Sequence, residues 1–195
     1  FDNLFGWLKK KEAGPAITFG RYSDNNKSAE KVQKWAEAET FFKQQEYAAG
    51  IDAFFEYLAD EEQQNVLLER IGGKIAFTIY QGSAVIRGEI DAGRVVAGVV
   101  LAKMPGPSIP AMRKLLEMNF HLYYTRYSLK EEKIYLLFDT DISTATPNKL
   151  YYGLKELASK ANRQDDLLIE EFGFPGPEDI APVIPVPDYE KEVKA

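Results

Sequence analysis

Apolar and polar residues alternate along residues 65–102 in a pattern that predicts four β-strands. Three two-residue turns separate the strands, Gly72-Gly73, Gly82-Ser83 and Ala92-Gly93, and each contains a glycine that can adopt the positive φ of a tight hairpin. Folding at these turns fixes the register. The predicted opposite pairs are Leu68 with Phe77, Val66 with Ile79, Ile79 with Ile86, Ile75 with Ile90, Ile90 with Val95, Gly88 with Ala97 and Ile86 with Val99. The sequence therefore predicts an antiparallel meander with one aliphatic face.

The second face of this meander is mixed in character. It carries Thr78, Arg87, Glu89 and Gly98, together with an apolar strip formed by Tyr80, Val85, Val96 and Val100. If no helix covers the strip, it is a candidate surface for a partner. The alternative is that the first helices of the chain cover it. The pattern alone leaves both open.

Helical periodicity appears before the meander. Val32, Trp35, Ala38 and Phe42 form one apolar stripe after the cap-rich polar turn at residues 24–27, and a second stripe continues to Leu58. Residues 28–58 therefore form either one long helix or an antiparallel pair of helices. In both cases we expect them to cover the sheet.

A helix, a hairpin and a long helix follow the meander. Ser108 is placed to cap a helix that continues to Phe120, with Pro110 in its first turn. Strands are predicted at residues 121–129 and 134–138, with Leu129 opposite Ile134 and Tyr127 opposite Leu136. Thr146-Pro147 opens the last helix, which ends at Gly173. The predicted class is α+β: a four-stranded antiparallel meander plus a hairpin, flanked by helices.

The two ends of the chain differ in composition from this central part. We expect an aromatic and basic segment at residues 1–27, a single domain at 28–172 and a proline-rich, unpacked tail at 173–195. Phe1, Leu4, Phe5 and Leu8 follow helical spacing and precede three lysines. This segment could dock on its own domain, in a partner's groove, or on an anionic membrane surface as a peripheral contact.

Composition limits the function classes. The chain of 195 residues has 24 basic and 30 acidic residues, a net charge of −6, and no cysteine. This balance favours a cytoplasmic protein and argues against a nucleic-acid partner, which requires a basic face. Disulfide scaffolds, thiol catalysis and cysteine metal sites are excluded.

The sequence contains little that points to catalysis. His121 is the only histidine, Asp139 and Asp141 follow a strand, and no glycine-rich phosphate loop opens a helix. These residues lack the partners that a metal site or a triad requires. We therefore expect no enzymatic activity, no cofactor and no metal. An uncharacterised enzyme that uses Asp139, Asp141 or His121 is the alternative.

The order of elements resembles the type III secretion chaperone fold, which includes Tir-chaperone-like and YbjN-like domains. The resemblance covers roughly residues 65–172 and rests on a local pattern: a helix ending in Leu116-Glu-Met-Asn119, strands at 123–129 and 134–138, and an amphipathic helix at 150–172. It implies a bacterial, non-enzymatic protein-binding module, chaperone-like or adaptor, that is commonly a homodimer and holds a protein or peptide partner.

Overall fold

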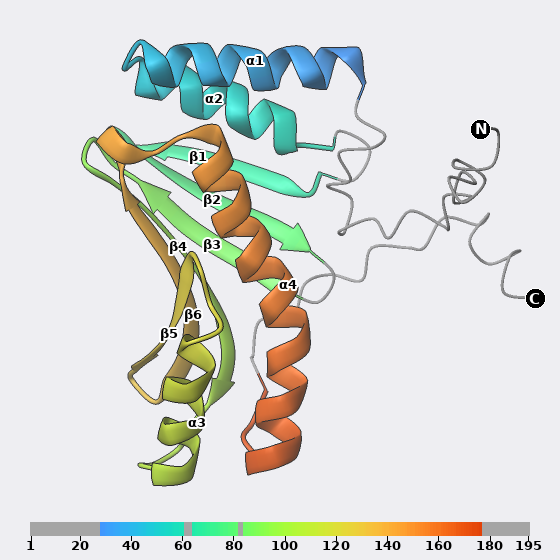
Figure 1. Ribbon diagram of the computed structural model, residues 1–195, viewed down its shortest axis with the longest axis vertical. Helices are drawn as coiled ribbons and strands as arrows, with labels where there is room; N and C mark the ends of the chain where they lie inside the picture. The colour runs from blue at the N-terminus through green and yellow to red at the C-terminus, as the bar shows by residue number, and fades with distance from the viewer. Residues whose placement is uncertain (1–27, 61–63, 82–83, 177–195) are drawn as a thin grey trace, which may run out of the picture.

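A computed structural model describes residues 28–60, 64–81 and 84–176 of the chain, and Figure 1 shows their arrangement. One six-stranded antiparallel sheet has the strand order β1-β2-β3-β4-β6-β5. The elements are α1 (Ala29–Lys43), α2 (Tyr47–Leu58), β1 (Val66–Ile71), β2 (Lys74–Gln81), β3 (Ala84–Ile90), β4 (Arg94–Lys103), α3 (Ile109–Asn119), β5 (Thr125–Lys130), β6 (Lys133–Asp141) and α4 (Pro147–Phe172). The predicted α+β class is confirmed.

The strand register follows the hydrophobic pattern. Leu68 lies opposite Phe77, Ile79 opposite Ile86 and Ile90 opposite Val95, as expected. The β3–β4 pairs run from Arg87↔Gly98 to Ile90↔Val95, and their spacing is that of the predicted register. In the second hairpin, Leu129 pairs with Ile134 and Tyr127 with Leu136, again as predicted.

One face of the sheet forms the core with the helices. Buried and partly exposed positions alternate along β2, β4 and β6, so every second side chain points to the helices. Phe55 of α2 lies with its ring centroid 5.0 Å from that of Phe77 in β2, and Gly153 of α4 lies against the ring of Phe138 in β6. The buried cluster includes residues from all four helices, so the described helices share this core face.

The first two helices form an antiparallel pair, which decides between the two alternatives left open by the sequence (Figure 1). Gln45 adopts a φ of 63° between them and turns the chain. Gly50 permits the close contact, because a Cβ at this position would lie 2.8 Å from the Phe42 ring. The Trp35 ring packs at a tilt against Tyr57 and in a T-shaped contact against Tyr151, and these contacts join α1 to α2 and α4.

The predicted caps of the last two helices are present. The side chain of Ser108 accepts a hydrogen bond from Ala111 N, and that of Thr146 accepts one from Lys149 N. Gly173 ends α4 in the left-handed conformation, with a φ of 65°.

Three local expectations differ from the structure. Glycine φ is positive at Gly72 and Gly73 but not at Gly93, where the Asp91 carboxylate instead accepts hydrogen bonds from Gly93 N and Arg94 N. The first strand of the second hairpin begins at Thr125 rather than at residue 121. Phe174, in the tail expected to be unpacked, is buried and stacks on Phe172, while Pro175 O accepts from Lys103 N.

Residues 1–27, 61–63, 82–83 and 177–195 lie outside the described part of the chain. The expectations for Phe1, Leu4, Phe5, Leu8 and the Gly82-Ser83 turn fall in these ranges. Within the described residues, no helix is both long enough and apolar enough to cross a membrane.

Candidate functional site

The face of the sheet that points away from the core is the candidate contact surface, and we call it the open face. Strand alternation and register place its side chains. Its apolar members come from five of the six strands: Leu67, Ile71, Ala76, Tyr80, Val85, Val96, Val100, Tyr135 and Leu137. The helices α1 and α2 lie on the core face, so they do not cover the strip predicted from the sequence.

The four residues of that strip are exposed to different extents. Val96 is 39% exposed, whereas Tyr80 and Val100 are half-buried. Val85 is only 6% exposed, although it is not a member of the core cluster. Leu67 and Ile71, which the sequence pattern does not place in the predicted strip, add exposed surface at the β1 side.

A glycine in the middle of the open face leaves room for a side chain of the neighbouring strand. A Cβ at Gly98 in β4 would lie 2.6 Å from Cδ2 of Leu137, so the leucine side chain lies directly across the neighbouring strand. Leu137 therefore lies between Gly98 and Arg126, its cross-strand neighbours on either side, and takes the space that a side chain at position 98 would fill. Exposed apolar surface of this kind is typical of contact sites.

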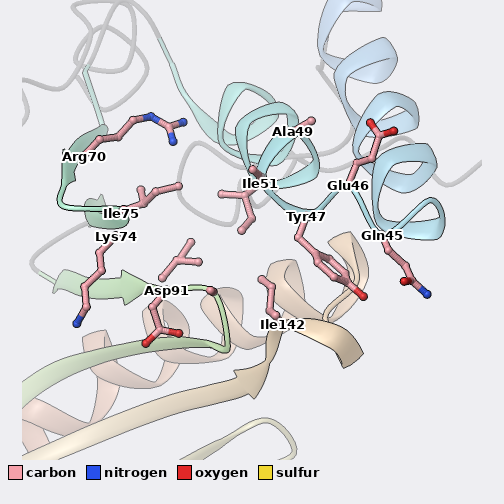
Figure 2. Close-up of a pocket in the computed structure, with 14 residues that line it drawn as sticks. Gln45, Glu46, Tyr47, Ala49, Ile51, Arg70, Lys74, Ile75, Asp91 and Ile142 are labelled. Carbon is pink, nitrogen blue, oxygen red and sulfur yellow. The ribbon is translucent and has the colours of Figure 1, made fainter.

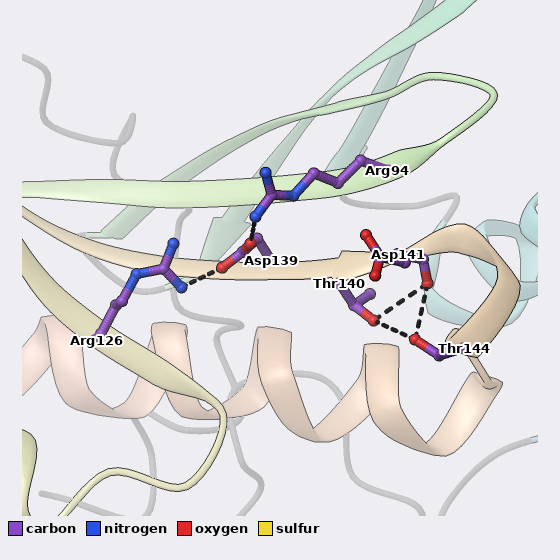
Figure 3. Close-up of polar contacts among 6 residues, drawn as sticks. All are labelled: Arg94, Arg126, Asp139, Thr140, Asp141 and Thr144. Carbon is purple, nitrogen blue, oxygen red and sulfur yellow. Dashed lines mark hydrogen bonds and ion pairs between the residues drawn. The ribbon is translucent and has the colours of Figure 1, made fainter.

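Two arginines share one carboxylate beside this apolar surface (Figure 3). Arg126 of β5 and Arg94 of β4 both donate to Asp139 of β6, and Asp139 is largely shielded from solvent. The hydrogen bond from Arg126, followed by that from Arg94, lowers the pKa of Asp139 below its usual value. Asp141 lies opposite Arg94 in the same ladder, so the two arginines and the two aspartates at this end of the open face balance in charge.

The three residues considered for catalysis make different contacts and do not form one site. Asp139 is held by the arginines, and Asp141 contributes its backbone carbonyl to Thr140 and Thr144 at the end of β6 (Figure 3). His121 lies in the turn after α3, where its backbone N–H donates to Met118 O. Within the described residues, no three His, Cys, Asp or Glu side chains are grouped to hold a metal ion.

A cavity of about 690 Å³ lies between the start of α2 and two turns of the sheet (Figure 2). Ile51, Ile75, Ile90 and Ile142 form its apolar floor. Its two basic residues are already paired, Arg70 with Asp52 and Lys74 with Glu89. The floor of this cavity suits an apolar side chain, and the acidic residues Glu46 and Asp91 also line it.

The outer side of α3 is a second exposed apolar surface. Ile109, Leu116 and Phe120 follow the helical spacing of one stripe, and we call them the α3 stripe. Phe120 is 89% exposed and the nearby Tyr123 is 92% exposed. Large side chains this exposed on one helix indicate a docking surface more often than isolated surface residues do.

Glu156 is an important residue that sequence reasoning missed. Its carboxylate accepts from the backbone N–H groups of Tyr123, Tyr124 and Thr125, at 2.7–3.3 Å, and from the Thr125 hydroxyl at 3.0 Å. Burial alone would raise the pKa of Glu156, but these hydrogen bonds together lower it. The contact spans more than thirty positions of sequence, so no local pattern could have indicated it.

Comparison with protein-family models gives no match, and no curated protein matches the chain. Solved structures do show similarity of fold. The type III secretion chaperone SycH of Yersinia pestis, solved with a fragment of YscM2, is 22% identical, with a TM-score of 0.43 over 60% of this chain and 97% of SycH. YbjN of E. coli, described as a putative transcription regulator, is 12% identical, with a TM-score of 0.44 over 66% of this chain and 96% of YbjN.

A third similar structure is the ExoU–SpcU complex of the Pseudomonas aeruginosa type III secretion system. The matched chain is 12% identical, with a TM-score of 0.32 over 55% of this chain and 86% of the matched one. The expected resemblance to type III secretion chaperone-like and YbjN-like proteins is thus found again, as a likeness of fold.

Proposed function

We propose that this chain is a non-enzymatic, chaperone-like or adaptor protein of the cytoplasm that binds a protein or peptide partner on its open face. The observation that carries the proposal is the one-sided cover of the sheet. The described helices share the core face, while Val96, Leu67 and Ile71 on the opposite face are exposed. Burying exposed apolar surface against a partner stabilises the complex by roughly 25 cal/mol per Å².

The apolar surface and the charges of the open face indicate the chemistry of the partner. Arg94 and Arg126 share Asp139, and Asp141 lies opposite Arg94, so the charges at this end of the face balance. Beside them lies the apolar surface around Gly98 and Leu137. The partner is therefore an extended segment with apolar side chains.

A second copy of the chain is the proposed occupant of the α3 stripe. Ile109, Leu116 and the C-cap residue Phe120 lie along one side of α3, and two copies of such a stripe can pack on each other about a two-fold axis. Arg113 and Glu117 flank the stripe on the same helix, which gives each copy one charge of each sign to offer the other. The protein would then be a homodimer with two separate open faces.

Two double variants test these assignments together. Val96→Asp with Val100→Asp places charges in the open face, and Leu116→Asp with Phe120→Asp places them in the α3 stripe. We expect the open-face variant to capture at least about tenfold less partner while it remains a dimer, because a buried unpaired charge opposes association. The α3-stripe variant should become monomeric and capture as much partner as the wild type. Affinity capture with mass spectrometry measures the partner, and analytical ultracentrifugation measures the oligomeric state.

Val32→Asp is the matched control, because Val32 is an exposed valine of α1 outside both surfaces. It should change neither measurement. If partner capture survives in the open-face variant while its circular dichroism stays unchanged, the open face is not the contact surface. If the α3 variant remains dimeric, the second copy binds elsewhere.

A further inference from the structure

The two edge strands of the sheet, β5 and β1, differ in how far side chains protect their outward backbone groups. At the β5 edge, the outward N–H of Thr125 donates to Glu156 and that of Tyr127 donates to Asn119 Oδ1 at 2.8 Å. Arg126 and Lys130 add charges to that strand. Such capping and charge prevent another strand from pairing with an edge. The β5 edge is therefore closed by side chains from α3 and α4.

The β1 edge is less protected: Glu69 and Arg70 carry charges, but among the described residues no side chain is seen to accept a hydrogen bond from its outward N–H groups. The strand is a regular six-residue segment without proline or lysine, and its Leu67, Leu68 and Ile71 are exposed. Arg70, its only cationic residue, is turned to Asp52 of α2. An exposed apolar edge of this length is a template for a further strand.

The alternation of hydrogen bonds along β1 shows which of its backbone groups can pair with a further strand. Tyr80 N donates to Asn65 O at 2.9 Å, so Asn65 and Tyr80 form a hydrogen-bonded pair of the antiparallel ladder. Hydrogen-bonded and non-hydrogen-bonded pairs alternate along such a ladder. The backbone groups of Val66, Leu68 and Arg70 therefore point outward, away from β2.

We propose that residues 16–23 of this same chain (AITFGRYS) pair with β1 as a seventh, antiparallel strand. The segment is rich in residues that favour strands, including Ile17, Thr18, Phe19 and Tyr22. Gly14-Pro15 separates it from the aromatic segment before it, and the polar residues 24–27 separate it from α1.

The place where the described chain begins supports this occupant. Lys31, in the first turn of α1, donates to Glu56 O near the end of α2, and Asn65 Nδ2 donates to Leu58 O at 3.5 Å. The start of α1, the end of α2 and the start of β1 thus meet at one corner, as Figure 1 also shows. Residues 24–27 can span about 13 Å when extended, which is the reach available to a strand placed before them.

The direction of the chain follows from the same geometry. Residue 23 would lie beside the beginning of β1 and residue 16 beside its end, which makes the pairing antiparallel. One face of the added strand would then cover Leu68 and the other would extend the open face beyond Leu67 and Ile71. The C-terminal residues 177–195 fit poorly, because Pro182, Pro185 and Pro187 lack the N–H groups that a ladder requires.

Residue-resolved amide hydrogen exchange on the full chain tests the proposal. The N–H groups of Leu68 and Arg70 should exchange on the order of 100-fold more slowly than in an unstructured peptide. Thr18→Pro with Phe19→Pro should abolish this protection, because proline removes the donors and the strand geometry. The matched control Lys10→Pro lies outside residues 16–23 and should leave the protection intact. Ile79 and Ile86 should stay protected in every variant.

Three results would overturn the proposal. Rapid exchange of Leu68 and Arg70 in the full chain means that the edge is unoccupied. Protection that survives the double proline variant and falls on dilution means that a second copy occupies the edge. Protection that survives the double variant at all concentrations means that another part of the chain does. None of these results bears on partner binding by Val96 and Val100, so the two proposals fail separately.

Discussion

Replacing Gly88 by alanine is expected to lower the free energy of unfolding by about 3 kcal/mol, at the upper end for overpacking a core. A Cβ at Gly88 would lie 2.1 Å from Cζ of Phe77 and 2.6 Å from the backbone oxygen of Val96. The Phe77 ring is buried against Phe55, and the Val96 oxygen belongs to the central strand β4, so neither can move without disturbing the sheet. Urea unfolding of Gly88→Ala, followed by circular dichroism, measures the loss.

Gly93→Ala is the matched control in the same hairpin. Its nearest neighbour would be Asp91 Oδ1 at 3.6 Å, an ordinary contact, and Gly93 does not require a positive φ. We expect a change within about 0.5 kcal/mol, as at most surface positions. Equal losses at the two glycines would mean that the ring of Phe77 does not lie over Gly88 as described.

Replacing Glu156 by glutamine is expected to cost about 2 kcal/mol at neutral pH, because the neutral amide accepts fewer and weaker hydrogen bonds. The lost contacts are those from Tyr123, Tyr124 and Thr125, which hold the turn between α3 and β5. The figure stays modest because the carboxylate is partly exposed and solvent screens its charge. Urea unfolding at pH 7 compares the variant with the wild type.

The same variant predicts a pH dependence with a definite sign. The pKa of Glu156 is lowered in the folded protein, so its stabilising effect is complete above the ordinary glutamate pKa of about 4.3. The effect is lost as the pH falls through the lowered pKa. The difference between wild type and Glu156→Gln should therefore shrink in acid. Glu171→Gln, on the same helix, loses only a 3.8 Å contact with Lys114 and should change little. A difference that grows in acid would contradict the assignment.

The meander could be predicted because short turns couple local chemistry to register. A turn at Gly72-Gly73 places Leu68 opposite Phe77, and the aliphatic pattern agrees with that register. The caps Ser108 and Thr146 were equally local. At the third turn, the Asp91 side chain accepts a hydrogen bond from Gly93 N, and Gly93 has no positive φ. The predicted position of this hairpin is therefore right, but its predicted backbone geometry is wrong.

Features that depend on distant parts of the chain could not be predicted. Whether α1 and α2 cover the core face or the open face depends on contacts such as Phe55 with Phe77, which no periodicity encodes. The capping of β5 by Glu156 depends on a residue far along α4. The pairing of Asp139 with Arg94 and Arg126 joins three strands, and no local pattern of residues predicts it. The exposure of Leu116 and Phe120 likewise depends on where α3 lies against β5.

The central claim is that the core occupies one face of the sheet and the partner the other. Thiol labelling tests it most directly, because the chain has no cysteine of its own. Val96 is 39% exposed on the open face and its neighbour Val95 is 3% exposed on the core face. In the free protein, Val96→Cys should react with a maleimide at least about 100-fold faster than Val95→Cys, which reacts only when the structure opens. Binding of the captured partner should slow the reaction at position 96 and leave that at position 95 unchanged. Equal rates in the free protein, or no slowing in the complex, would contradict the account.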